Sequence, residues 1–134
     1  MRQLLIIAIA LCTPCVYSHA AGEVARSPHW PKVRAEHLVK EPACVACGVS
    51  GRGTSIEVHH IIPFHVDRAK ELDPTNLITL CVKGGRLACS CHLTFGHLGN
   101  FHRYNPDVRR DAERMRAALK QADNRAKAKT EITR

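Results

Sequence analysis

The spacing of the cysteines limits more than any other feature how this chain can fold. Cys44 and Cys47 form a C-x-x-C pair, and a second group begins more than thirty residues later with Cys81, Cys89 and Cys91. Two such groups are the usual layout of a paired zinc knuckle, in which thiolates from two segments surround one tetrahedral ion. A chain of 134 residues has a small core that benefits from such a staple. We therefore expect four of these five thiols to form one structural Zn²⁺ site.

The N-terminal segment is typical of a secretory signal peptide. Residues 1–20 carry one positive charge near the start, an apolar run from Leu4 to Cys12, and small residues before an expected cleavage after Ala20. The run is shorter than the roughly 20 apolar residues that a transmembrane helix needs. We therefore expect a secreted or periplasmic protein with no stable membrane partner after cleavage, and a membrane-anchored protein with an uncleaved leader as the minor alternative.

Export would place the remaining cysteines in an oxidising compartment, where disulfides compete with zinc binding. Cleavage removes Cys12 and Cys15 and leaves five cysteines. An odd number does not form a closed disulfide set. Zinc is the favoured interpretation, and a disulfide-rich interaction protein stays open as an alternative.

Helix and strand patterns alternate along the rest of the chain. Residues 21–31 are predicted to be an exposed lead-in, and apolar spacing predicts a helix that ends before Pro42. Residues 56–62 are predicted to be a strand, and residues 76–81 a second strand or the opening turn of a short helix. We expect the domain to cover residues 32–119, followed by a basic helix end and tail over residues 120–134.

The last helix is predicted from its capping residues. Asn105 can cap, Pro106 suits the first helical position, and an apolar stripe follows on an otherwise charged helix. Fraying is expected from Lys127. The stripe consists of Val108, Ala112, Met115 and Leu119.

Two adjacent histidines, His59 and His60, lie inside the first predicted strand. Successive side chains of a strand point to opposite faces, so the two imidazoles cannot serve one site in the same way. One can bind a metal ion while its neighbour has another role. For both to act on one substrate, we expect a local distortion of the hairpin to turn His60 toward the site.

Four motifs in order resemble the HNH, or ββα-metal, nucleases, specifically small members with a zinc-knuckle frame. They are CVAC, EVHHIIPFH, LDPTNLITLC and CHLTFGHLGNFHRYNP, and they span roughly residues 30–115. Each motif is weak alone, whereas their order and spacing together are strong. The resemblance implies an α+β fold, a small ββα-metal domain framed by a structural zinc knuckle, with flanking helices.

The resemblance also implies a role for each matching residue. His59 would bind the catalytic divalent metal, His60 would be the general base, and Asn76 would hold the base-bearing loop through side-chain hydrogen bonds. His92 would complete the metal site, with His97 as an additional or substitute ligand. The metal could be Mg²⁺, Mn²⁺, Ni²⁺ or Zn²⁺.

The same resemblance selects the structural zinc ligands. The segment between Cys81 and Cys91 is longer than in many relatives and carries the extra Cys89. Similar inserts in small relatives favour the last cysteine as the ligand, and Cys89 stays open as its substitute. The expected ligands are Cys44, Cys47, Cys81 and Cys91.

These residue types suit phosphodiester hydrolysis. The reaction needs an activated water and a cation that stabilises the charge developing on the phosphate. A neutral imidazole can accept a proton near neutral pH, and a net charge of +8 suits a polyanionic partner. We expect a metal-dependent endonuclease that acts on DNA with little sequence preference. The alternative is a zinc-stapled nucleic-acid-binding module without catalysis, and an inhibitor protein is conceivable as a partner.

Two groups of side chains have competing interpretations. The basic face of the last helix is a weak candidate for phosphate contacts, with a solvated surface as the alternative. The aromatic residues could stack on bases, but we expect them to fill the small core. The basic face comprises Arg109, Arg110, Arg114 and Arg116, and the aromatic residues are Phe64, Phe95, Phe101 and Tyr104.

Overall fold

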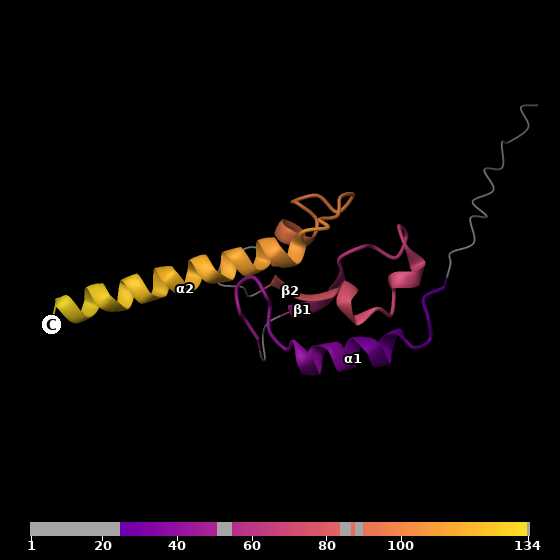
Figure 1. The fold of residues 1–134 in the computed structure, drawn as a ribbon, viewed down its shortest axis with the longest axis horizontal. Helices are drawn as coiled ribbons and strands as arrows, with labels where there is room; N and C mark the ends of the chain where they lie inside the picture. Colours follow the sequence, from indigo (N-terminus) through magenta and orange to yellow (C-terminus); the bar gives the residue numbers. More distant parts are fainter. Residues whose placement is uncertain (1–24, 51–54, 84–86, 88–89, 134) are drawn as a thin grey trace, which may run out of the picture.

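A computed structural model describes residues 25–50, 55–83, 87 and 90–133 of the chain. The predicted leader, residues 1–20, and Cys89 lie outside the described residues. In chain order the elements are α1 (Trp30–Lys40), β1 (Ser55–His60), the short 3₁₀ turns η1 (Arg68–Lys70) and η2 (Pro74–Asn76), β2 (Leu77–Lys83), η3 (His92–Gly96) and α2 (Val108–Ile132) (Figure 1). This combination of helices with a small two-stranded sheet confirms the predicted α+β fold. No helix in the described part of the chain is long and apolar enough to cross a membrane.

The two strands pair antiparallel and bring the histidine pair next to the start of β2. His59 lies opposite Ile78, and His60 lies opposite Leu77. The register irregularity between these strands falls between Ser55 and Ile56, at the far end of the sheet. The distortion predicted beside the histidines is therefore not found, because the pairing is regular there.

The core lies between the cysteine-bearing turn, β2 and the first turns of α2. Residues 77–81 are all buried, so both faces of β2 are covered. This resolves the choice between strand and helix for that segment in favour of a strand. The buried residues that pack together include Ala46, Ile78, Leu80, Val108 and Ala112.

Helix α2 begins two residues later than predicted. Asn105 accepts a hydrogen bond from the Asp107 backbone N–H and donates one to the Asp111 carboxylate, each at 3.0 Å. It therefore tightens the turn that contains Pro106, and the helix starts at Val108.

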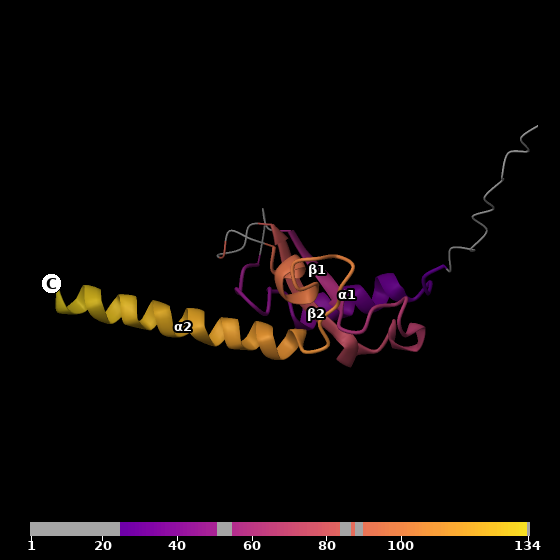
Figure 2. The same ribbon diagram turned by 90° about the horizontal axis from the view of Figure 1, so that it is seen from above.

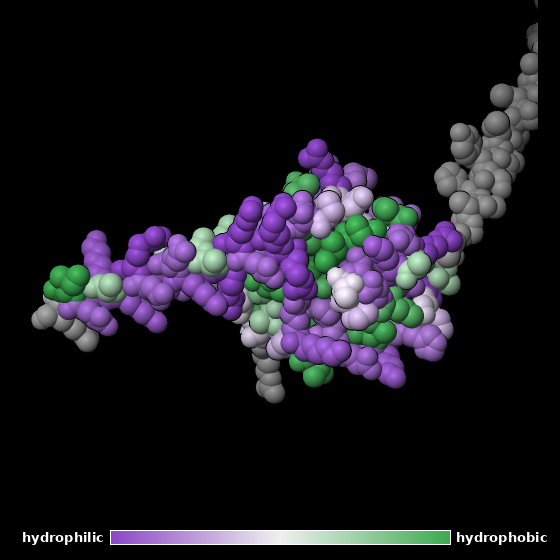
Figure 3. All heavy atoms as spheres, in the orientation of Figure 1, coloured by the Kyte–Doolittle hydropathy of each residue, from purple (hydrophilic) through white to green (hydrophobic). Residues whose placement is uncertain are grey.

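Helix α2 also continues past Lys127, where fraying was predicted, and ends at Ile132. The apolar stripe meets the core as far as Leu119, and beyond it nearly every described side chain is exposed. Figure 2 shows the second half of α2 leaving the domain as an arm, and its surface is mainly hydrophilic in Figure 3.

The segment before α1 is more than an exposed lead-in. The helix starts at Trp30, inside the range predicted to precede it. The Ser27 backbone N–H donates to the buried carboxylate of Glu71 at 3.0 Å, and the Arg26 guanidinium lies 3.4 Å from the same carboxylate. These contacts fasten the chain before α1 to the loop between the strands.

A carboxylate at the end of α1 joins three elements. Glu41 accepts hydrogen bonds from the Thr79 backbone N–H at 2.6 Å and from Arg109 at 2.9 Å. Arg109 also donates to the Leu77 carbonyl at 2.8 Å. Despite its partial burial, the pKa of Glu41 is lowered by its bonds to Arg109 and Thr79. Helices α1 and α2 are thus both tied to β2 by one side chain.

We predict that Glu41→Ala lowers the free energy of unfolding by about 1–3 kcal/mol, because Arg109 and the Thr79 N–H lose a charged acceptor. Urea denaturation at a fixed zinc concentration measures the change. Glu36→Ala on the same helix is the control, since its exposed pair with Lys32 is 3.9 Å long and contributes at most ~0.5 kcal/mol. Equal effects of the two substitutions would show that the Glu41 contacts do not stabilise the fold.

Candidate metal centres and active site

Four buried cysteines from three segments converge on one point. Their sulfur atoms all lie within 4.8 Å of one another, and Cys47 Sγ is 3.7 Å from Cys81 Sγ. Four sulfurs that each lie ~2.3 Å from one tetrahedral ion are about 3.7–3.8 Å apart. All four are free thiols rather than disulfides. The cluster of Cys44, Cys47, Cys81 and Cys91, called here the thiol cluster, therefore has the spacing of a structural zinc site.

The ionisation of these thiols also favours a cation. A hydrogen bond from Cys91 lowers the pKa of Cys44, so one sulfur readily carries a charge. The same bond raises the pKa of Cys91, and burial raises that of Cys81 to about 11. Several thiolates in one buried place repel one another unless a cation neutralises them. The donor set thus fits Zn²⁺, whose binding requires deprotonated thiols.

The turn that carries the first two cysteines depends on glycine. Gly48 has a φ of +77°, and its backbone N–H donates to the Cys44 carbonyl at 2.7 Å. The guanidinium of Arg116 lies where a β-carbon on Gly48 would stand. A larger residue would be strained in this conformation and would collide with Arg116.

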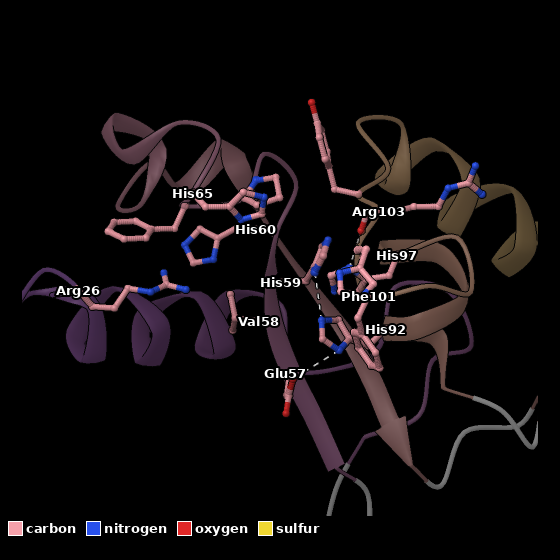
Figure 4. A pocket seen from close by; sticks show the side chains of 14 residues that line it. Arg26, Glu57, Val58, His59, His60, His65, His92, His97, Phe101 and Arg103 are labelled. Carbon is pink, nitrogen blue, oxygen red and sulfur yellow. Dashed lines mark hydrogen bonds and ion pairs between the residues drawn. The ribbon is translucent and has the colours of Figure 1, made fainter. Parts of the chain in front are cut away.

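Three histidines form a second cluster of ligand atoms beside the sheet. Their candidate nitrogen atoms lie within 4.8 Å of one another, and His59 Nδ1 is 3.1 Å from His92 Nε2. Two nitrogens bound to one ion at ~2.0–2.1 Å are about 2.9–3.4 Å apart. Figure 4 shows the three rings pointing toward one another. We call His59, His92 and His97 the histidine triad.

The local helix geometry explains how two of these histidines meet. His92 and His97 are five residues apart, and in an α-helix they would differ by about 140° around the axis. Here His92–Gly96 forms a π-helical turn, which is wider. The two ring centroids are consequently 4.9 Å apart.

Neighbouring groups orient the triad with lone pairs toward its centre. The His97 Nδ1–H donates to the Arg103 carbonyl at 2.7 Å, which leaves Nε2 as the acceptor nitrogen. The Glu57 carboxylate lies 3.5 Å from His92 Nδ1 on the side away from His59. Carboxylates and carbonyls commonly orient metal-binding histidines in this way.

The remaining member, His59, is the most buried of the three. Burial, reinforced by the nearby rings of His92 and His97, lowers its pKa to about 3. Its Nε2 is buried without a hydrogen-bond partner in the described part of the chain. A neutral, tightly packed set of three imidazoles fits a divalent metal ion that prefers nitrogen ligands, such as Zn²⁺ or Ni²⁺.

His60 lies on the other side of β1 and contacts different groups (Figure 4). Its Nε2–H donates to the Glu71 carbonyl at 2.9 Å, and its ring lies 4.5 Å from the Trp30 ring between centroids. Nδ1 is therefore the acceptor nitrogen. Burial is the main reason that the pKa of His60 is lowered, with the nearby charge of Arg26 acting in the same direction.

Asn76 ties together the loop between the two strands. Its side-chain oxygen accepts from the Ile62 backbone N–H at 2.7 Å, and its amide N–H groups donate to the Ile62 and Lys70 carbonyls at 3.0 Å. These bonds hold the chain that leaves His60 against the segment that carries Glu71. Asn76 directly precedes β2, and its buried amide is bonded to Ile62, two residues beyond the end of β1.

Both sides of β1 open into one pocket of about 430 Å³. The histidine triad lines one side and His60 the other, and Arg26 and Arg103 also line it. Because β1 ends at His60, side chains from opposite faces of the strand reach the same space. This arrangement needs no distortion of the strand.

The predicted core role of the aromatic residues is wrong for part of the set. Phe95 packs against the core, but Phe101 is 64% exposed and Tyr104 37% exposed, and both line the pocket. The turns between η3 and α2 hold them outward.

Most arginines of the predicted basic face have partners within the domain. Arg109 pairs with Glu41, Arg110 with Asp107 at 3.0 Å, and Arg116 lies against Gly48. Arg114 is exposed. A nucleic-acid role for this face stays a prediction.

Comparison with protein families finds a match for the segment that carries Cys44, Cys47 and both strands. Residues 44–84 match the family model described as HNH endonuclease. This segment resembles the HNH endonuclease domain. No curated protein and no solved structure matches the chain. The HNH resemblance predicted from the motifs is confirmed, and it indicates a function in nucleic-acid chemistry.

The HNH match ends before Cys91, His92 and His97, which the fold supplies from the segment after β2. Sequence reasoning missed other groups around the HNH site. Glu57 had a signal, since it lies two residues before His59 on the same face of a strand. Glu71 and Gly96 had none, because their contacts depend on residues distant in the sequence.

We predict that Cys91→Ser lowers zinc content to well below one ion per chain and lowers stability, because the thiol cluster loses a soft ligand. Metal analysis of the purified protein measures zinc, and thermal denaturation measures stability. Cys89→Ser is the control and should retain zinc. The reverse pattern would make Cys89 the ligand.

The His59 ring is packed against Gly96, where a β-carbon would lie 2.9 Å from Cε1. We predict that Gly96→Ala displaces this ring and weakens binding of Ni²⁺ or Mn²⁺ at the histidine triad about tenfold or more. Isothermal titration of zinc-loaded protein measures the affinity. Gly99→Ala is the control for a nearby glycine with open space around it, although its φ of +80° adds backbone strain. Unchanged affinity in Gly96→Ala would mean that the triad tolerates the displacement.

Proposed function

We propose that this chain is a metal-dependent endonuclease that hydrolyses phosphodiester bonds of DNA. The observation that carries the proposal is that a histidine triad and a separately held histidine line one pocket from opposite sides of β1. Such hydrolysis needs both a cation site and a proton acceptor close to one phosphate.

His60 is the proposed general base. The Glu71 carbonyl and the Trp30 ring hold its imidazole, and the bond at Nε2–H leaves the Nδ1 lone pair for a water proton. Asn76 supports this geometry indirectly, because it holds the loop that follows His60 against the segment that leads to Glu71.

His59, His92 and His97 are the proposed ligands of the catalytic divalent metal. When bound, the ion would stabilise negative charge on the phosphate and on the leaving oxygen. The outer contacts of Glu57 and Arg103 keep the triad oriented toward its centre. The thiol cluster would hold the structural Zn²⁺ and takes no part in the reaction.

Arg26 is the proposed phosphate contact opposite the triad. Its guanidinium lies 4.6 Å from the centre of the Phe64 ring and near the Glu71 carboxylate, while about half of the side chain is exposed. A guanidinium held in this way can bind phosphate oxygens through paired donors. Contacts of this kind carry no sequence information, which supports cleavage with little sequence preference.

The leader-like residues 1–20 support export, and we propose that the nuclease acts outside the cytoplasm. The proposal of export rests only on the apolar run and on the small residues at the expected cleavage site after Ala20.

We predict that the purified chain converts supercoiled plasmid to open circles with Mg²⁺, Mn²⁺ or Ni²⁺, and that His60→Ala reduces the rate about 10²- to 10⁴-fold. Gel analysis of initial rates measures it, with zinc content and circular dichroism as checks of the fold. His29→Ala is the control, since His29 is exposed and lies outside the pocket.

If His60→Ala cleaves as fast as the parent protein, His60 is not the base. If neither protein cleaves with any of these ions while both retain zinc and bind DNA, the chain is a zinc-stapled binding module instead.

A further inference from the structure

An exposed aromatic segment borders the pocket beside the histidine triad. We call residues 98–104 the rim loop. Three of its side chains are large, apolar and open to solvent, with exposed fractions of 50% for Leu98, 64% for Phe101 and 37% for Tyr104. Phe101 and Tyr104 also line the pocket that holds His59 and His60. Clustered apolar exposure at the mouth of a polar pocket is typical of a binding surface.

The exposure is built into a well-bonded loop. The Asn100 N–H donates to the His97 carbonyl and the Arg103 N–H to the Asn100 carbonyl, both at 2.9 Å. The Arg103 carbonyl in turn accepts from His97 Nδ1. Leu98 takes a φ of +51°, a strained conformation for a leucine, at the start of these turns. The fold therefore holds Phe101 outward rather than leaving it without a place in the core.

Phe101 is joined directly to the proposed metal site. Its ring centroid lies 5.0 Å from that of His97 and 6.2 Å from that of His92. A ligand that covers the open part of this ring would therefore lie beside the triad. Arg26, which lines the same pocket, makes it attractive to an anion, whereas the Arg103 side chain points away from the triad (Figure 4). A planar apolar group that carries flanking phosphates fits both features.

We propose that the rim loop binds an unpaired nucleobase next to the phosphate that is cleaved, stacked on Phe101, and that the chain therefore prefers single-stranded DNA to a perfect duplex. The position of that phosphate rests on the proposed function. A base inside a duplex is stacked on its neighbours and offers no free face, whereas an unpaired base does. Stacking on an aromatic ring tolerates any base, so the preference concerns strandedness rather than sequence.

The test measures binding without added divalent ions, so that it does not depend on cleavage. The probe is a short single-stranded oligodeoxynucleotide that contains 2-aminopurine, compared with a hairpin duplex of the same sequence. Fluorescence anisotropy gives the affinity for zinc-loaded, full-length protein, and the change in 2-aminopurine emission reports stacking. The variants are Phe101→Ala and Phe101→Trp, and Val39→Ala is the control because Val39 is 82% exposed on α1 outside the pocket.

We expect wild-type protein to bind the single strand more tightly than the duplex. Phe101→Ala should weaken single-strand binding about five- to 150-fold and abolish the emission change, while Phe101→Trp and Val39→Ala retain both. The proposal is overturned if Phe101→Ala binds the single strand like the wild type, or if the wild type binds the duplex at least as tightly.

Cleavage assays separate this inference from the proposed function. If Phe101→Ala nicks plasmid and still binds the single strand like the wild type, the stacking proposal is wrong and the proposed nuclease function stands. If single-strand binding depends on Phe101 but the wild type cleaves no DNA, the stacking proposal stands and the proposed nuclease function is wrong.

Discussion

The structure depends first on bringing four buried sulfurs to one point. The thiol cluster joins the turn at Cys44 and Cys47 to β2 through Cys81, and to the start of η3 through Cys91. His92 follows Cys91 directly, so the position of the thiol cluster also sets where the histidine triad begins. A small apolar core gives the turn that carries His92 and His97 little support by packing alone. A cation bound by these sulfurs would thus organise the candidate site without taking part in the proposed reaction.

Strand β1 then places two neighbouring histidines in different surroundings. Alternation along β1 sends His59 to the triad and His60 toward α1, where Trp30 and the Glu71 carbonyl receive it. Because the strand ends at His60, the pocket extends around its end and both rings face one space. The roles proposed for these two imidazoles, metal binding and proton acceptance, need different surroundings, and the opposite faces of one strand provide them.

Local patterns in the sequence predicted the parts of this architecture that depend on spacing. Spacing predicted the cysteine groups, the alternation at His59 and His60, and the helices. The family resemblance, which rests on the order and spacing of motifs, named the residues of the histidine triad. The remainder depends on contacts between distant segments. Asn105 shifts the start of α2 by bridging to Asp111 and to the Phe95 carbonyl, and residues before α1 are fastened by Glu71, more than forty positions away. The exposure of Phe101 follows from the turns around it, whereas its hydrophobicity predicted burial.

Net charge gives the least reliable guide to the site. A total of +8 indicates a polyanionic partner, and the arginines of α2 are the obvious candidates to meet it. In the fold, Arg109 is committed to Glu41 and Arg116 to the cysteine-bearing turn, so part of that charge stabilises the domain. Arg26 matters more for the pocket than the net charge does, because Phe64 and Glu71 hold its positive guanidinium beside the pocket. The affinity of such a pocket for phosphate depends on where a few cations are held, and a charge count does not contain that information.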